Sequence, residues 1–147
     1  MLQNRSIPRC TVIPQLAYPD VIQAVTWLCS AFGFTVRISM GSHRAQLNVG
    51  DGAVVIMESP TGDAGLAPAD SPCRDLFCSV MVRVADVDRH CAHARQAGAK
   101  ILREPATHPY GERQYSAEDF AGRIWAFSQS VADMLPEDWG GESVELK

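Results

Sequence analysis

A helical pattern, a glycine and a strand pattern follow one another twice in this chain, and this repeat restricts the fold more than any other feature. In the first copy, residues 20–32 place apolar side chains three and four apart, Gly33 ends the pattern, and residues 34–38 alternate as a strand. In the second copy the helical pattern starts at Asp86, and Gly98 follows Gly33 by 65 residues. A repeat of this length predicts two copies of one small module that share a core.

Strand patterns around each helix complete the two modules. Module one covers about residues 10–59 and is expected to run strand, helix and three strands, with Gly50 and Asp51 as the hairpin loop. Module two covers about residues 76–128 and repeats this order, with a turn at residues 119–122 before its last strand. The strands are expected at residues 10–17, 34–40, 43–49, 52–59, 76–84, 100–103, 113–118 and 123–128.

Two further segments lie outside the repeat. Residues 59–75 are rich in proline and glycine and are predicted to link the modules. Residues 129–147 form a tail that carries apolar side chains, including Trp139, and is expected to dock as a short helix or arm. The whole chain, residues 1–147, is interpreted as one domain, because half-size modules cannot bury enough surface separately.

Charge and composition restrict the classes of partner that the protein could bind and the compartment in which it is expected. The net charge of -4 and the isoelectric point near 5.5 argue against a nucleic-acid partner, which requires a basic face. No apolar run approaches the length of a membrane span, and the amino terminus has no signal-peptide core, so a cytoplasmic protein is expected. The five cysteines form no CxxC pair, which indicates neither a disulfide framework nor a zinc-thiolate site.

The order of these elements resembles the vicinal oxygen chelate superfamily, which includes glyoxalase I, bleomycin-resistance proteins and extradiol dioxygenases. The resemblance covers roughly residues 10–130 and rests on AFGF closing the first helix, QAGAKILREP closing the second, and an ED..G turn before the last strand. It implies an α+β fold in which two tandem βαβββ modules form a curled mixed-sheet cup, with the helices outside and the ligand inside.

The resemblance also implies places for metal ligands. Enzymes of the superfamily hold a divalent metal with His, Gln or Glu on the first and last strands of each module. Counted onto this chain, those places fall on residues without ligand character. A shift by two residues would bring in Gln15 and Glu58, but two oxygens are too few for a transition-metal site. We therefore predict no metal and no cofactor. The four places are Ile13, Ile56, Ser79 and Ala126.

Strand alternation then assigns side chains to the inner face of the cup. The first hairpin is expected to pair His43 with Glu58, and the last to turn Tyr115 inward while Trp125 and Phe127 pack under the helices. His90 and His93 are expected on the exposed side of the second helix. The predicted ligand-contact residues are Gln15, His43, Glu58, Ser79, Met81, Arg83, Arg113, Tyr115 and Ser128.

Two of these contacts have alternative interpretations. Arg83 and Arg113 could clamp a carboxylate or phosphate of a ligand, or pair with acidic residues at the rim. His43 and Glu58 could act as an acid–base couple, or form an ordinary cross-strand ion pair. No catalytic residue is assigned.

The favoured function is a metal-free, non-catalytic binder of a small organic molecule, similar to the bleomycin-resistance branch. The alternative is a glyoxalase-like lyase or isomerase that holds a metal with Glu58, Gln15 and His43. A third interpretation is a structural or regulatory dimer whose cup is unused. A homodimer is predicted in each case, because the linker allows modules to be exchanged and the tail exposes apolar residues. The sequence does not indicate which ligand is bound.

Overall fold

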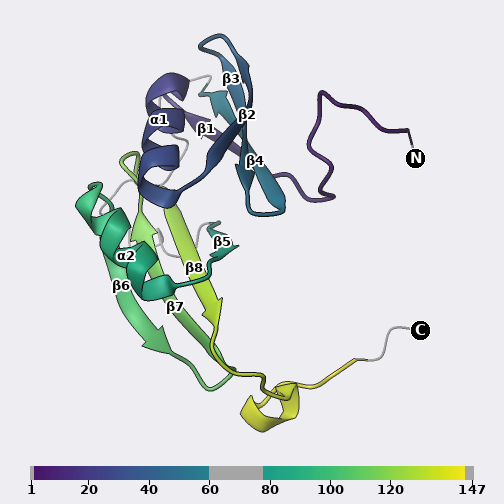
Figure 1. Cartoon of the computed structure of the whole chain (residues 1–147), viewed down its shortest axis with the longest axis vertical. Coiled ribbons are helices and arrows are strands. Elements are labelled where there is room, and N and C mark those ends of the chain that lie inside the picture. Colours follow the sequence, from purple (N-terminus) through teal and green to yellow (C-terminus); the bar gives the residue numbers. More distant parts are fainter. Residues whose placement is uncertain (1, 60–77, 145–147) are drawn as a thin grey trace.

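The computed structural model describes residues 2–59 and 78–144 of the chain. The expected linker therefore lies almost wholly outside the described residues. The described part contains two modules with the same order of elements (Figure 1). None of its helices is long and apolar enough to cross a membrane.

Module one forms a four-stranded mixed sheet with one helix. Its strand order is β1-β4-β3-β2, with β1 parallel to β4 and the other neighbours antiparallel. Val49 pairs with Gly52, which confirms the predicted two-residue hairpin. The elements are β1 (Gln15–Tyr18), α1 (Val21–Phe32), β2 (Thr35–Met40), β3 (Arg44–Val49) and β4 (Gly52–Glu58).

Module two repeats this arrangement in the order β5-β8-β7-β6, with β5 parallel to β8. The predicted α+β fold of two βαβββ modules is confirmed, and the tail contains the expected short helix as one 3-10 turn. The elements are β5 (Val80–Arg83), α2 (Val87–Gln96), β6 (Lys100–Thr107), β7 (Glu112–Glu118), β8 (Ile124–Ser130) and η2 (Pro136–Trp139).

Local signals fix where both helices begin and where α1 ends. The side chains of Asp20 and Asp86 each accept a hydrogen bond from the backbone N–H three residues on, which satisfies a donor that the first helical turn leaves free. Gly33 ends α1 with φ of 79°, and its N–H donates to the carbonyl of Cys29. Only glycine adopts this left-handed conformation without strain.

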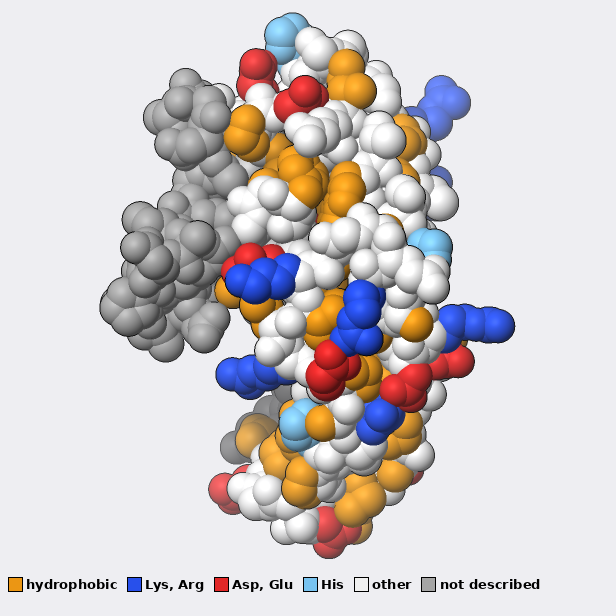
Figure 2. All heavy atoms as spheres, turned by 90° about the vertical axis from the view of Figure 1, so that its left-hand side faces the viewer, with side chains coloured by type: hydrophobic (Ala, Val, Ile, Leu, Met, Phe, Trp, Pro, Cys, Tyr) orange, Lys and Arg blue, Asp and Glu red, His pale blue; other side chains and the backbone are white. Residues whose placement is uncertain are grey.

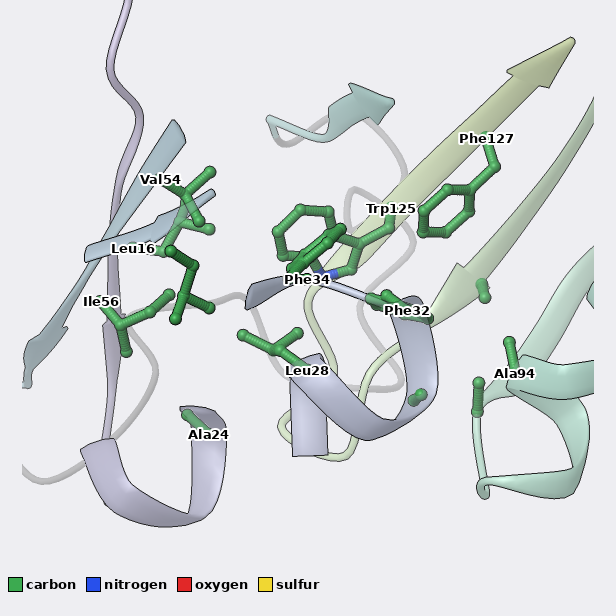
Figure 3. Close-up of a cluster of buried hydrophobic side chains, with 14 of the residues drawn as sticks. Leu16, Ala24, Leu28, Phe32, Phe34, Val54, Ile56, Ala94, Trp125 and Phe127 are labelled. Carbon is green, nitrogen blue, oxygen red and sulfur yellow. The ribbon is translucent and has the colours of Figure 1, made fainter. Parts of the chain in front are cut away.

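The two modules share one core, because aromatic side chains of module one pack against module two. The Phe32 ring lies 4.8 Å from that of Phe127, and the Phe34 ring lies 5.4 Å from that of Trp125 (Figure 3). Trp125 and Phe127 are fully buried, as predicted. Each module therefore completes its core with residues of the other.

Helices α1 and α2 lie together on one side of the molecule, and both sheets turn their other face away from them (Figure 1). Their contact includes two histidines of α2: His90 Nε2 lies 3.0 Å from the carbonyl oxygen of Phe32, and His93 Nε2 lies 2.7 Å from that of Ser30. The expectation of a solvated ring is wrong for His90, which is partly buried, whereas His93 is exposed as expected. Both rings nevertheless cap carbonyls in the last turn of α1. Basic and acidic side chains lie side by side across the helix side (Figure 2).

Candidate functional site

The sheet faces that point away from the helices, here called the open faces, define the candidate site. In module one the register sets Ala45 opposite Ile56 and Leu47 opposite Val54. All four side chains are buried in the core with α1. Ile56, which the resemblance counts as a ligand place inside the cup, therefore lies under the helix with the most apolar face of the sheet. The open face instead carries the alternate residues, such as Arg44, Gln46 and Val55.

In module two the turn between β7 and β8 sets the register. Asp119 Oδ1 accepts hydrogen bonds from the backbone N–H groups of Ala121 and Arg123, and Glu118 pairs with Ile124. The turn expected at residues 119–122 would pair Asp119 with Gly122, and the observed turn is one residue longer than that register requires. This difference moves every residue of β7 to the other face relative to β8.

Tyr115 is consequently placed on the helix face, opposite Phe127, and its predicted position in the cup is wrong. Its side chain is buried, and its hydroxyl lies 2.6 Å from His90 Nδ1. Because a carbonyl can only accept, His90 Nε2 carries the hydrogen bonded to Phe32, and Nδ1 accepts from the Tyr115 hydroxyl. Burial lowers the pKa of His90 and raises the pKa of Tyr115.

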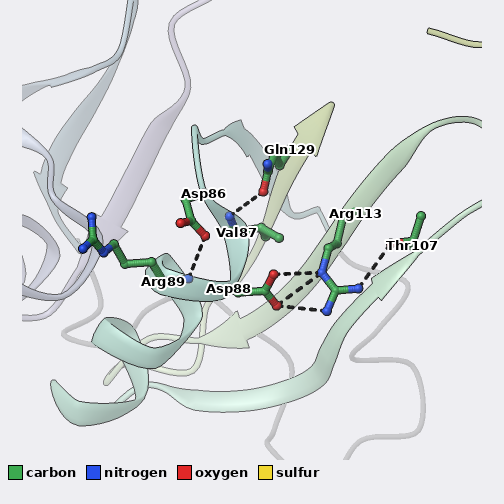
Figure 4. A network of polar contacts seen from close by, with 7 residues as sticks. All are labelled: Asp86, Val87, Asp88, Arg89, Thr107, Arg113 and Gln129. Atoms are coloured by element: carbon green, nitrogen blue, oxygen red, sulfur yellow. Dashed lines mark hydrogen bonds and ion pairs between the residues drawn. The ribbon is translucent and has the colours of Figure 1, made fainter. Parts of the chain in front are cut away.

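Arg113 also lies on the helix face, against α2 (Figure 4). Its guanidinium donates to both carboxylate oxygens of Asp88, at 2.9 and 3.0 Å, and to the hydroxyl of Thr107. The hydrogen bond from Arg113 lowers the pKa of Asp88. Of the two interpretations of Arg113, pairing with an acidic residue is confirmed, and its placement inside the cup is wrong.

His43 and Glu58 do meet, with 3.1 Å between Nδ1 and Oε2, but at an exposed strand end. Glu58 pairs with Tyr18 and so shares the helix face, whereas Gln15 pairs with Val55 on the open face. The three side chains proposed for a metal-dependent enzyme therefore do not converge. Among residues 2–59 and 78–144, no three His, Cys, Asp or Glu side chains gather as a metal site would need.

Five of the predicted contact residues do belong to the open side. Met81 and Arg83 of β5 pair with Ala126 and Ser128 of β8, so these side chains share one face. Met81 is 62% exposed although it is apolar. Ser79 lies two residues before Met81 and is exposed, and Gln15 accepts a hydrogen bond from Arg44 on the open face of module one.

A chain of hydrogen bonds crosses the open face of module two and was not predicted. The hydroxyl of Tyr110 donates to Gln114 Oε1, Gln114 Nε2 donates to Ser128 Oγ, and Ser128 Oγ donates to Glu112 Oε1, over 2.8 to 3.0 Å. Hydrogen bonds from Ser130 and Ser128, with the charge of Arg83 nearby, lower the pKa of Glu112. The correct turn length would have placed Glu112 and Gln114 beside Ser128, since it fixes the register.

The arrangement defines a class of protein with two βαβββ modules, helices outside and a polar open face. The sequence model of the Glyoxalase/Bleomycin resistance protein/Dioxygenase superfamily matches residues 7–127. The chain belongs to this superfamily. A comparison with curated protein sequences finds no match.

Solved structures agree with this assignment. TioX from Micromonospora sp. ML1 is 30% identical over 86% of this chain and 100% of its own, with a TM-score of 0.65. A glyoxalase/bleomycin resistance protein/dioxygenase from Nocardioides is 18% identical over 96% of this chain and 92% of its own, with a TM-score of 0.61. A family enzyme from Burkholderia phytofirmans PsJN is 14% identical over 80% of this chain and 96% of its own, with a TM-score of 0.64. The last two show the shared fold only.

Proposed function

We propose that this protein binds a small organic molecule against the open faces of its sheets, without a metal and without catalysis, as a cytoplasmic homodimer. The polar chain from Tyr110 to Glu112 carries the proposal. Buried polar networks usually serve packing, but this one lies on the sheet face opposite α2, beside exposed Met81 and Arg83. Apolar surface with a few fixed polar groups is the usual design of a small-molecule site.

Arg83 supplies the charge of this site. It shares the face of Ser128, and its charge helps to lower the pKa of Glu112. Arg113 differs, because Asp88 already occupies its guanidinium. A ligand with an acceptor group would therefore bind Arg83 rather than Arg113.

A ligand screen by thermal shift tests the proposal. Arg83→Met should reduce the shift given by each ligand that stabilises the wild-type protein, whereas Arg113→Met, the matched control on the helix face, should leave that shift unchanged. Elemental analysis of the purified protein should find no stoichiometric zinc, nickel, manganese or iron. Stoichiometric metal that Gln15→Leu or Glu58→Gln reduces would favour the enzyme instead.

A further inference from the structure

The open face of module one is covered by the chain's own amino terminus. Gln46 is 4% exposed, and Ala53 and Val55 are each 7% exposed, although all three lie on the face opposite α1. The covering segment is residues 4–10, here called the N-terminal strap, which includes the buried Pro8. In Figure 1 the amino-terminal chain runs along the side of the sheet that faces away from α1.

Two side chains hold the strap by its backbone. Arg37 Nη2 donates to the carbonyl oxygens of Arg5 and Ile7, at 2.8 and 3.2 Å. Gln46 Nε2 donates to the carbonyl oxygen of Ser6 at 2.8 Å. The register of β2 shifts between Val36 and Ile38, so that Arg37 sits in a bulge and also donates to Gln46 Oε1. Three consecutive carbonyls are thus bound, and no strap side chain takes part in these bonds.

The strap offers Arg37 hydrogen-bond acceptors but no negative charge. All of its hydrogen-bond acceptors are neutral oxygens, and among the described residues no carboxylate forms an ion pair with it. A carboxylate offers the same kind of acceptor oxygen and adds a negative charge, so it forms an ion pair with the guanidinium and commonly accepts two parallel hydrogen bonds from it. A carboxylate would therefore compete well with the strap carbonyls.

A cavity of about 240 Å³ lies between the strap and the β3–β4 hairpin. The cavity is lined by Pro8, Arg9 and Cys10 of the strap, by Arg37 of β2, and by residues 48 and 50–53 of the hairpin. Ligand sites usually measure about 300–1,000 Å³. With the strap in place the cavity is below this range, and displacement of Pro8 would enlarge it directly beside Arg37.

We propose that Arg37 and Gln46 form an acceptor-binding site on the open face of module one, that the strap is its displaceable internal occupant, and that a carboxylate-bearing organic ligand replaces the strap. This inference rests on the proposed function only in placing the ligand on the open side. It adds the chemical class of the ligand, a carboxylate, and identifies the strap as the segment that the ligand must displace. Because the strap is tethered, its effective concentration is in the millimolar range, which lowers the apparent affinity of any competing ligand.

Limited trypsin digestion tests whether the strap is held. Trypsin cuts after Arg5 and Arg9, and the loss of residues 1–5 or 1–9 is followed by intact mass. Arg37→Met should speed this loss by about tenfold or more, because a hydrogen bond to a charged group contributes about 1.5–3 kcal/mol. Gln46→Leu removes a hydrogen bond between neutral groups and should speed it by about two- to tenfold. Arg44→Met is the matched control on the same face, since Arg44 bonds Gln15 and not the strap. Wild-type cleavage as fast as that of Arg37→Met would overturn the proposal.

A peptide pair tests the preference for a carboxylate. Pro8→Gly removes the buried ring that anchors the strap and keeps Arg37 and Gln46. The probes are LQNRSI, residues 2–7, with a free carboxylate or an amide at its end, so that the charge falls where Arg37 meets the carbonyl of Ile7. Calorimetry should show the acid binding Pro8→Gly about tenfold more tightly than the amide, and Arg37→Met in that background should remove the difference.

Equal affinities of acid and amide, or no binding of either peptide to folded Pro8→Gly, would contradict the proposal. Neither readout depends on a ligand of the Arg83 site. If the strap experiments succeed while the ligand screen finds nothing, the Arg37 site stands and the proposed function fails. If ligands stabilise the protein through Arg83 but the acid and the amide bind Pro8→Gly equally, the proposed function stands and the Arg37 site fails.

Discussion

The hydroxyl of Tyr18 in β1 donates a 2.6 Å hydrogen bond to Asp119 Oδ2 in the turn between β7 and β8, so that a buried polar contact joins the two modules. Trp125 Nε1 donates to the same oxygen at 3.0 Å. Asp119 Oδ1 accepts from two backbone N–H groups of the turn. One carboxylate therefore fixes the turn, orients the central tryptophan and binds the other module.

Loss of the Asp119 carboxylate should lower the free energy of unfolding more than loss of the Tyr18 hydroxyl. Asp119→Ala leaves the Tyr18 hydroxyl and the Trp125 N–H buried without an acceptor, and should lower the free energy of unfolding by about 3–5 kcal/mol. Tyr18→Phe removes one of four hydrogen bonds and should cost about 1–3 kcal/mol. Urea unfolding at a fixed protein concentration measures both. Glu104→Ala, at an exposed ion pair, is the control and should stay within about 0.5 kcal/mol of wild type.

Tyr115 should behave as a core residue and not as a ligand contact. Its side chain is as deeply buried as that of Trp125, so Tyr115→Ala and Trp125→Ala should each destabilise the fold by about 3–5 kcal/mol. Tyr115→Phe keeps the ring but leaves His90 Nδ1 without its donor, and should cost about 1–2 kcal/mol. Thermal melts compare the three variants. A Tyr115→Ala protein that melts close to wild type would mean that β7 presents its other face.

The helix boundaries could be predicted because their signals are local. Asp20, Gly33 and Asp86 act through the backbone of their own helix, and their roles do not depend on the rest of the fold. The faces of the strands depend on distant contacts. Residues 53–56 form an unbroken apolar run. Val54 and Ile56 are buried against α1, whereas Ala53 and Val55 are buried on the face of the N-terminal strap. Without alternation, the sequence alone does not say which face is open.

The candidate site was missed for related reasons. The extra residue of the β7–β8 turn arises from hydrogen bonds to the Asp119 side chain, and one residue is enough to exchange Tyr115 for Gln114 on the open face. Arg37 lies in a bulge, where strand alternation does not hold. The strap has no signal in the sequence, because residues 4–10 show no periodic pattern and are held by their backbone carbonyls.

The stability of the protein should fall at mildly acidic pH because of His90. An unfolded histidine titrates near pH 6.5, and burial lowers the pKa of His90 in the folded protein. As the pH falls below about 6.5, the unfolded chain takes up a proton that the folded protein refuses, so stability decreases until the folded pKa is reached. Above about pH 6.5 the ring is neutral in both states and has no effect on the pH dependence.

Two measurements check this expectation. NMR titration of the ring signals should give His90 a pKa below that of an unfolded histidine, and a normal or raised value would contradict the assignment of Nδ1 as an acceptor. The fall in unfolding free energy between pH 7 and 5 should be smaller in His90→Gln than in wild type.

The tail should stabilise the proposed dimer, and Gly111 should control its position. The tail exposes 38–65% of four apolar side chains in the single chain: Val131, Met134, Leu135 and Trp139. Exposed apolar side chains gathered on one arm are typical of a surface that a partner covers. The tail is held at its start, where the N–H groups of Val131 and Ala132 donate to the carbonyl of Gly111, and further along, where the Trp139 ring lies 5.4 Å from that of Tyr110. The strand end and the arm are therefore one unit.

Gly111→Ala tests this arrangement because a Cβ there would lie 2.3 Å from the backbone oxygen of Ala132, and φ is 82°. The substitution must shift the tail away from β7. Gly41→Ala is the matched control: its φ is also positive, at 55°, but no atom lies within 4 Å of the added Cβ. Sedimentation at micromolar concentration should give a dimer for wild type and Gly41→Ala, and a weaker dimer for Gly111→Ala and for a chain truncated after Gln129. A wild-type protein that sediments as a single 16.0 kDa chain would rule out the dimer, and unchanged association of the truncated chain would exclude the tail from its interface.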